Sequence, residues 1–220
     1  MGNEAWKNYF DHKAEEHGAS VKTSDYFDDA SFFMQRDNLL RWLGNVEGLE
    51  ILDAGCGVGA FSEPLVKNNT VYGVDFSEKS LAFAAKRGLV TLNGDLAALP
   101  FPDGKFDVVF CIGVIQLIPD SALVLKELSR VTKPGGVLLV QTLHKGSIQR
   151  TLLALVEKEK KFDRLYTMEE LEQTFADNGF ADISFQKLYH PFRCVTTGSC
   201  SCLTDCLCTS FAIKGRKQGA

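Results

Sequence analysis

The stretch ILDAGCGVGAFS, residues 51–62, joins an apolar run to a glycine-rich turn. The apolar run stops at Asp53, and Gly55, Gly57 and Gly59 follow at alternate positions. Glycine lets the backbone approach a ligand closely, although three glycines can also serve the turn alone. The dinucleotide-binding fingerprint is GxGxxG, whereas this turn has the spacing GxGxG and no phosphate-loop lysine beside it. An acid, Asp53, before the turn and no lysine beside it favour a nucleoside that carries a cationic group over one that carries a pyrophosphate.

Strand and helix patterns alternate around this turn. Apolar runs predict five strands, and the stretches between them predict helices. The expected strands are residues 49–55, 71–77, 89–95, 106–114 and 135–143, and the expected helices are residues 61–68, 78–88 and 120–133. This alternation is typical of a parallel sheet with right-handed crossovers. The 220 residues, 45% of them hydrophobic, are therefore predicted to form one doubly wound α/β domain.

Further elements are expected on both sides of this core. Each is predicted from the helical or alternating spacing of its apolar residues. They are helices over residues 31–43, 145–161 and 167–179 and strands over residues 181–189 and 209–217.

Polar or glycine-rich positions follow four of the expected strands. In an open parallel sheet, ligands bind outside the carboxyl ends of the strands. The positions in question are Asp53 with Gly55, Asp75, Asp95 and residues 111–113. Asp75, about 20 residues after the glycine turn, could accept hydrogen bonds from ribose hydroxyls or could cap the next helix. Four successive strand ends of this kind predict a ligand site at this edge of the sheet.

Taken together, these stretches resemble the class I S-adenosylmethionine-dependent methyltransferases, in particular the ubiquinone/menaquinone-methyltransferase-like group (methyltransferase type 11). ILDAGCGVGAFS resembles the first motif of that family, and VYGVDFSEKSL resembles its ribose-binding second motif. NGDLAALPFPDGKFDVVFCIGVIQLIPD resembles the adenine loop and the fourth strand, and LKELSRVTKPGG resembles the turn before the fifth strand. The resemblance implies a Rossmann-like, seven-stranded sheet, mostly parallel, with one antiparallel strand near the C-terminal end.

The resemblance also implies S-adenosyl-L-methionine as the cofactor and S-adenosyl-L-homocysteine as its product. Asp53 would lie near the ammonium group of the cofactor, and Asp75 would bind both ribose hydroxyls. Phe76 would lie against the adenine, and Asp95 would accept a hydrogen bond from the adenine amino group. Gln116 would face the methyl group or the acceptor. The other positions that the family pattern assigns to the cofactor are Gly55, Cys56, Gly57, Leu96 and Cys111.

Methyl transfer requires few catalytic groups from the protein, because a sulfonium methyl group is already a strong electrophile. The protein must align a nucleophile, exclude water and, where needed, remove a proton. His144, just after the fifth strand, and His190, between the last two strands, are the candidate catalytic bases. A packed or surface histidine is the alternative at both positions.

The domain is expected to have three parts. Residues 46–143 form the cofactor-binding core, and residues 144–220 supply a substrate-side insertion and the C-terminal strands. Residues 1–45 are expected to form a helical lid. The aromatic side chains of this lid could cover the cofactor or merely pack helices against the sheet. They are Trp6, Tyr9, Phe10, Tyr26, Phe27, Phe32 and Phe33.

Five of the seven cysteines lie in the segment CVTTGSCSCLTDCLC, residues 194–208. A single extended strand would place Cys200 and Cys208 roughly 26 Å apart, which is too far for one metal ion. A metal or metalloid site would need a chain reversal near residues 203–205. Idle thiols and a disulfide or redox role are the other interpretations, and no metal site is predicted. The role of this segment stays open for Cys194, Cys200, Cys202, Cys206 and Cys208.

Charge and composition narrow the expected partners. The net charge is -4, and the basic residues are spread among acids, which argues against nucleic acid or anionic lipid as the main partner. No apolar stretch reaches the roughly 18 residues that a membrane span needs, and the first residues lack the apolar core of a signal peptide. Seven cysteines without a secretion signal favour a reducing cytoplasm. A small molecule is the expected partner, and the sequence leaves the oligomeric state open.

The sequence therefore predicts an S-adenosylmethionine-dependent methyltransferase that moves a methyl group to a small-molecule acceptor by in-line displacement. A non-catalytic S-adenosylmethionine-binding module with a protein partner is one alternative. A nicotinamide-dependent oxidoreductase is another, and the glycine spacing disfavours it. The acceptor and the methylated atom do not follow from the sequence, because catalysis by positioning leaves no residue signature.

Overall fold

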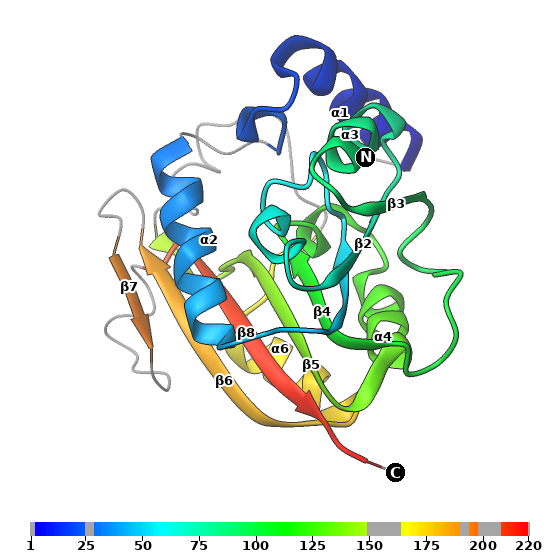
Figure 1. The fold of residues 1–220 in the computed structure, drawn as a ribbon. Helices are drawn as coiled ribbons and strands as arrows, with labels where there is room; N and C mark the ends of the chain where they lie inside the picture. Colours follow the sequence, from blue (N-terminus) through cyan, green and yellow to red (C-terminus); the bar gives the residue numbers. More distant parts are fainter. Residues whose placement is uncertain (1–2, 25–28, 149–163, 190–193, 198–207, 220) are drawn as a thin grey trace.

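The computed structural model describes residues 3–24, 29–148, 164–189, 194–197 and 208–219. Its centre is one sheet with the strand order β3-β2-β1-β4-β5-β8-β6-β7 (Figure 1). The strands are β1 (Glu50–Ala54), β2 (Thr70–Asp75), β3 (Val90–Asn93), β4 (Phe106–Ile112), β5 (Thr132–Leu143), β6 (Phe180–Tyr189), β7 (Cys194–Thr197) and β8 (Ser210–Lys217). The α-helices are α1 (Asn3–His17), α2 (Asp29–Leu43), α3 (Glu78–Lys86), α4 (Ser121–Val131) and α6 (Met168–Asp177).

The direction of the strands follows the predicted fold class. Strands β3, β2, β1, β4 and β5 are parallel. Strand β8 lies between β5 and β6 and is antiparallel to both, so β6 runs in the direction of β5. The predicted doubly wound sheet, mostly parallel with one antiparallel strand near the C-terminal end, is confirmed for these seven strands. The short strand β7, antiparallel to β6, adds an eighth that the sequence pattern does not predict.

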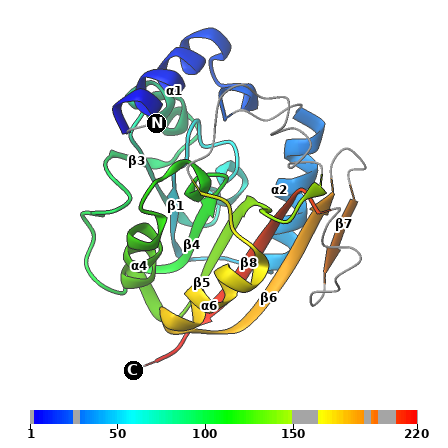
Figure 2. The same ribbon diagram turned by 180° about the vertical axis from the view of Figure 1, so that it is seen from behind.

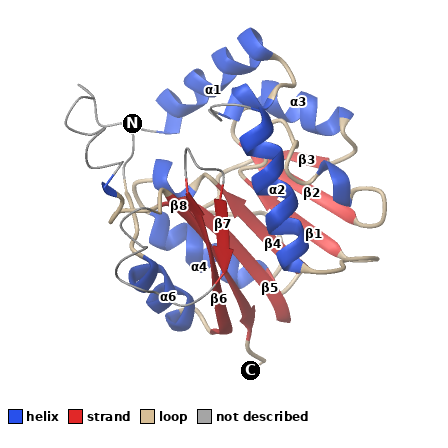
Figure 3. Ribbon diagram, turned by 90° about the vertical axis from the view of Figure 1, so that its left-hand side faces the viewer, coloured by secondary structure: helices blue, strands red, loops and turns tan. Residues whose placement is uncertain are grey.

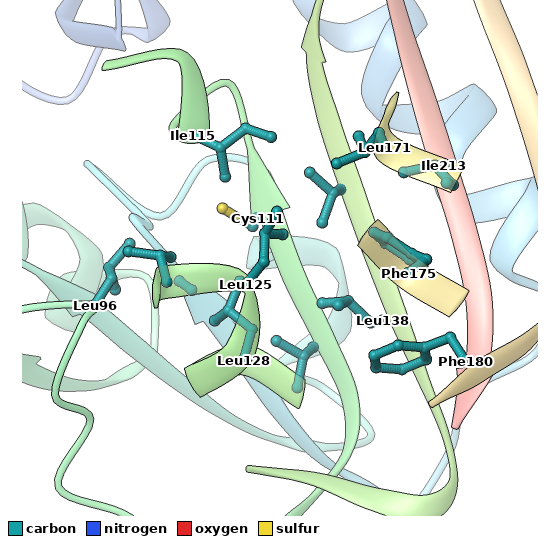
Figure 4. Close-up of a cluster of buried hydrophobic side chains, with 14 of the residues drawn as sticks. Leu96, Cys111, Ile115, Leu125, Leu128, Leu138, Leu171, Phe175, Phe180 and Ile213 are labelled. Carbon is teal, nitrogen blue, oxygen red and sulfur yellow. The ribbon is translucent and has the colours of Figure 1, made fainter. Parts of the chain in front are cut away.

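Helices cover both faces of the sheet. On one face, Leu39 of α2 and Ala84 of α3 lie in an apolar cluster with residues of β1, β4 and β5. Helices α4 and α6 cover the opposite face, which Figure 2 shows from behind. Figure 4 shows the centre of this second cluster, with Leu125, Leu128, Leu171 and Phe175 from the helices and Cys111, Leu138 and Ile213 from the strands.

The helix ends follow signals that are visible in the sequence. The Ser77 side chain accepts a hydrogen bond from the Ser80 amide at 3.1 Å and so begins α3. Thr167 and Glu170 form a reciprocal capping box at the start of α6. Caps of this kind each contribute about 1 kcal/mol, because they satisfy amides that have no partner within the helix.

The helix expected over residues 145–161 lies almost wholly outside the described residues. Two of the expected elements that fall within them differ from the structure. The helix expected over residues 61–68 is a single 3-10 turn, Glu63–Leu65. The Asn69 side chain donates to the Leu65 carbonyl at 2.9 Å, and this bond takes the place of a continued helical turn. Strand β5 begins at Thr132 rather than residue 135, because Thr132 still pairs with Phe106 of β4. No helix in the described ranges is long and apolar enough to cross a membrane.

Helices α1 and α2 bring the N-terminal segment to the carboxyl ends of the strands. An ion pair joins Glu15 of α1 to Lys79 of α3, and Ser77 donates to Asp11 at 2.6 Å. Helix α2 crosses the sheet in front of its strands (Figure 3), and Lys214 of β8 donates to the Trp42 carbonyl at 2.7 Å. The site is therefore bounded by segments from the start of the chain as well as by the core.

Candidate functional site

A cavity lies at the carboxyl ends of β1, β2 and β4, between these ends and helices α1 and α2. Its wall includes two acids, Asp53 at the end of β1 and Asp75 at the end of β2. Ile112 and Gly113 close the end of β4. Within the described part of the chain, no Lys, Arg or His lines this cavity. The cavity therefore has an anionic end and an otherwise apolar or neutral wall.

The glycine turn after β1 forms one side of the cavity. Gly55, Gly57 and Gly59 have φ values of 80°, 50° and 77°, in the left-handed region that favours glycine. A Cβ on Gly55 would lie 2.4 Å from a methyl carbon of Val114. A Cβ on Gly59 would instead lie 3.0 Å from the Ala84 backbone in α3. Gly55 thus keeps the cavity wall open, whereas Gly59 permits close packing of the helix.

The Asp75 carboxylate ties the glycine turn to the second strand. One oxygen accepts a hydrogen bond from the Gly57 amide at 2.9 Å, and the other accepts from the Ser77 amide at 2.9 Å. Ser77, not Asp75, supplies the side-chain cap of α3. Burial raises the pKa of Asp75, while these amide donors act in the opposite direction. Asp75 is thereby fixed at the cavity wall with oxygen lone pairs left for a further donor.

Asp53 is the more deeply buried acid, with 2% of its surface exposed. Burial raises its pKa to about 7, and the nearby negative charge of Asp75 adds to the effect. The Ser62 hydroxyl donates a hydrogen bond to Asp53 and acts in the opposite direction. A cation placed beside Asp53 would favour its ionised form, so the site is suited to a positively charged group.

Aromatic side chains from α1 and α2 cover the cavity. Trp6, Phe10 and Phe32 line it from these helices, and Phe76 lines it from the end of β2. The rings of Phe10 and Phe76 are 6.3 Å apart, and Trp6 stacks on Phe10 at 5.8 Å. The Trp6 indole nitrogen is buried and has no hydrogen-bond partner among the described residues. Three aromatic residues expected in the lid therefore lie at the cavity.

Of the other positions that the family pattern assigns to the cofactor, some line the cavity and some do not. Cys56 and Leu96 line the cavity. Asp95 is exposed, does not line the cavity, and accepts a hydrogen bond from the Ala97 amide at 2.9 Å. Cys111 lies in the apolar cluster on the far face of β4 (Figure 4). Gln116 is buried beside the cavity, where its amide oxygen accepts from the Thr142 hydroxyl at 3.1 Å.

Both cysteines of the core are buried. Burial raises the pKa of Cys56 and of Cys111, so neither is a thiolate at neutral pH. Cys208 is also buried, and its thiol lies 2.9 Å from the Ser210 carbonyl oxygen. The expectations for Cys200, Cys202 and Cys206 fall outside the described residues, as do the side chain of Cys194 and the whole of His190.

His144 lies apart from the cavity-lining residues. It follows β5, is 5% exposed, and its ring meets the edge of Phe211 at 5.6 Å between centroids. Its amide donates to the Thr209 carbonyl at 3.0 Å. This placement matches the packed alternative, and a role as base stays a prediction.

Several cavity-lining residues are not singled out by the sequence. Thr23, Phe61 and Val114 line the wall. Each is a common residue of a helix, turn or buried strand end, and such residues look the same in sequence whether they face a core or a cavity. Their contribution becomes visible only when the strand ends and the N-terminal helices are assembled.

Comparisons with known proteins agree with this geometry. Residues 52–140 match the model of a family described as a methyltransferase domain. A malonyl-[acyl-carrier protein] O-methyltransferase from Hamiltonella defensa is 37% identical over 140 residues, which are 61% of this chain and 54% of that protein. A demethylmenaquinone methyltransferase from Lactococcus lactis is 40% identical over 121 residues, 50% of this chain and 48% of that protein. The chain thus spans about half the length of the curated relatives it matches.

A solved structure of another methyltransferase is similar to this chain over nearly its whole length. A crystal structure of a methyltransferase from Thermotoga maritima, described as a possible histamine N-methyltransferase, has 26% identity and a TM-score of 0.73. The match covers 96% of this chain and 99% of that one. The fold and the strand-end motifs are thus similar to those of class I S-adenosylmethionine-dependent methyltransferases. Within that class, residues of this chain are similar in sequence to the demethylmenaquinone and ubiquinone biosynthesis methyltransferases.

Proposed function

We propose that this chain binds S-adenosyl-L-methionine and transfers its methyl group to a small-molecule acceptor, releasing S-adenosyl-L-homocysteine. The observation that carries the proposal is the pair of acids, buried Asp53 and partly buried Asp75, beside the glycine turn in a cavity without a basic lining residue among those described. A sulfonium and an ammonium group suit this charge pattern, whereas the pyrophosphate of a nicotinamide cofactor would meet two acids and no cation.

The residues at the anionic end fit the groups of this cofactor. A carboxylate has about four lone-pair sites, so Asp75 can accept from two ribose hydroxyls while it holds Gly57 and Ser77. Asp53 would stabilise the ammonium group. Gly55 and its neighbours Cys56 and Gly57 would offer backbone to the methionine part of the cofactor.

The adenine would lie further along the cavity. Phe76 and Leu96 line that part of the wall and would contact the ring. Asp95 would accept from the adenine amino group, and Cys111 would contribute only backbone. Gln116 would face the acceptor side.

The reaction uses the electrophilic methyl group that the cofactor carries. The chain holds the acceptor in line with that group and excludes water. Trp6, Phe10 and Phe32 place apolar surface over the cavity, which supports a lid role for residues 1–45. Residues 144–220 complete the acceptor side. His144 and His190 are retained as candidate bases, and rate–pH profiles of His144→Asn and His190→Asn variants test them.

Calorimetry on the purified chain tests the proposal. We expect micromolar binding of both S-adenosylmethionine and S-adenosylhomocysteine, and loss of both in Asp75→Ala. Folded wild-type protein that binds neither would contradict the proposal and favour a module that binds a protein partner. Tighter binding of NADH would instead favour the oxidoreductase. We further propose a cytoplasmic location, which rests on the cysteine content alone.

A further inference from the structure

Three glutamines are buried on the side of the sheet that α2 covers. Gln35, Gln141 and Gln186 are 3%, 4% and 6% exposed. One amide atom of each has no hydrogen-bond partner among the described residues: Nε2 of Gln35 and Oε1 of the other two. Each such buried atom lowers the free energy of unfolding by about 1–3 kcal/mol. Three of them on one side of the sheet therefore need an explanation, such as a bound ligand.

The register of the sheet places two of these glutamines in one row. Gln141 of β5 pairs with Ala212 of β8, and Ala212 in turn pairs with Gln186 of β6. Directly paired residues project from the same face of a sheet, and neighbouring strands lie about 4.8 Å apart. The two glutamines therefore flank Ala212, whose side chain is the smallest that could lie between them without being a glycine.

Gln35 faces this row from α2. Phe32 and Leu39 belong to the apolar cluster that also contains Ala212. Gln35 is three residues after Phe32 and four before Leu39, so it lies on the same side of the helix. Figure 3 shows α2 in front of the sheet, and Lys214 of β8 donates to the Trp42 carbonyl of α2.

The row lies next to the cavity. Gln141 pairs with Ile112 of β4, and both Ile112 and Gly113 line the cavity. A Cβ on Gly113 would lie 3.6 Å from Oε1 of Gln141 and 3.9 Å from Nε2 of Gln116. The Gln141 amide therefore lies directly behind Gly113, outside the cavity lining but separated from the cavity only by a residue without a side chain. Phe32, on the Gln35 face of α2, lines the same cavity.

Among the charged side chains of these elements, Arg36 and Lys214 have partners elsewhere, and the buried Lys187 of β6 projects from the face of the sheet opposite to Gln186. Arg36 pairs with Asp37 and donates to the Ala60 carbonyl at 3.5 Å. Lys214 donates to the Trp42 carbonyl. An acceptor group bound between the three glutamines would meet amides without a counter-ion, so burial of a carboxylate or an ammonium there would be costly.

We infer that Gln35, Gln141 and Gln186 bind the methyl acceptor and select an uncharged hydroxyl or amide group on it. Such a group donates to an amide oxygen and accepts from an amide nitrogen, which matches the unpartnered atoms. This inference rests on the proposed function and names the acceptor class for the same cavity. It makes the three glutamines determinants of specificity, separate from the anionic cofactor end.

A matched set of small probes tests the inference on the full chain saturated with S-adenosylhomocysteine. Benzyl alcohol, benzoate and benzylamine share one ring and differ only in a neutral, anionic or cationic group. We expect benzyl alcohol to bind at least about 10-fold more tightly than the two charged probes by ligand-observed NMR. Equal binding of the three probes would overturn the inference.

Variants assign that preference to the glutamines. Gln141→Leu and Gln186→Leu should each weaken benzyl alcohol binding by about 5- to 10-fold, because one hydrogen bond is lost. Gln173→Leu is the control, since Gln173 is exposed and bonds only to Asp177 of its own helix. Ala212→Val keeps every amide but enlarges the side chain between them, and should also weaken binding. Unchanged binding in these variants would show that the amides hold only internal water.

The two levels of proposal fail separately. If S-adenosylhomocysteine itself does not bind, the cofactor proposal is contradicted. If it binds and the probes show no preference for the neutral group, only the acceptor inference is contradicted.

Discussion

The two ends of the cavity are built from very different lengths of chain. At the cofactor end, the bond from Gly57 to Asp75 joins the ends of the neighbouring parallel strands β1 and β2, over only 18 residues of chain. At the acceptor end, Gln35, Gln141 and Gln186 come from α2, β5 and β6 and meet only across the assembled sheet. The cofactor end is specified by local motifs, and the acceptor end by register and helix placement. Cofactor binding can therefore be inherited unchanged while acceptor choice varies through a few distant positions.

The largest expected effect tests the cofactor end. Asp75→Ala removes an acceptor that holds two backbone amides and that we propose binds the ribose, so affinity for S-adenosylhomocysteine should fall by about 100-fold or more. Asp95→Ala is the matched comparison, because Asp95 is exposed and outside the cavity lining. We expect it to weaken binding by less than about 10-fold, as one hydrogen bond would. Calorimetry measures the affinity of both variants for S-adenosylhomocysteine. Equal losses would contradict the proposal that Asp75 contributes more to cofactor binding than Asp95 does.

The next largest effect distinguishes the cost of a steric clash from the cost of a strained backbone. Gly55→Ala and Gly135→Ala both place a side chain at positive φ, at 80° and 77°. Only Gly55 has a neighbour in the way, since a Cβ would lie 2.4 Å from Val114, whereas nothing lies within 4 Å at Gly135. We expect Gly55→Ala to lower the free energy of unfolding by about 2–4 kcal/mol and Gly135→Ala by about 1 kcal/mol. Urea unfolding checks both values; an equal loss would mean that Val114 moves aside without cost.

The sequence predicts the strands, the glycine turn and the helix caps of this region well, because their signals are local. The GxGxG turn, the Ser77 and Thr167 caps and the strand runs each act within a few residues. Side-chain direction is less accessible: the family pattern includes Cys111, yet its thiol lies in the opposite core, because successive strand residues alternate between faces.

The acceptor end leaves only a faint signal in the sequence. Gln141 in LLVQTL and Gln186 in SFQKL are polar residues at inward positions of apolar strands, and Gln35 interrupts the apolar stripe of α2. Each taken alone is an ordinary exception. Their convergence depends on β8 inserting between β5 and β6, which is a long-range feature of the fold.

A third effect is a pH dependence that belongs to the cofactor end alone. The pKa of Asp53 is about 7, above its ordinary value of 3.8, so the folded chain holds a proton that the unfolded chain has lost between about pH 4 and 7. Asp53 therefore makes the ligand-free chain less stable as pH rises through that window, and Asp53→Asn should remove this component. A cofactor ammonium favours the ionised form, so affinity for S-adenosylhomocysteine should rise about tenfold from pH 6 to pH 8. Calorimetry at several pH values should show this rise in the wild type and a flat profile in Asp53→Asn; a rise in both would assign it to another group.

The smallest expected effect is the sharpest test of the acceptor end, because its sign is unusual. A buried glutamine that serves the fold loses stability when its amide is removed, whereas one with an unpartnered oxygen gains stability when an apolar residue of similar size replaces it. We expect Gln141→Leu to raise the free energy of unfolding of the ligand-free chain by about 1 kcal/mol, visible as a higher melting temperature. The same variant should bind S-adenosylhomocysteine normally and bind benzyl alcohol less well. A gain in stability together with weaker benzyl alcohol binding would show that Gln141 destabilises the fold and serves acceptor binding. A loss of stability would instead mean that the Gln141 amide stabilises the fold.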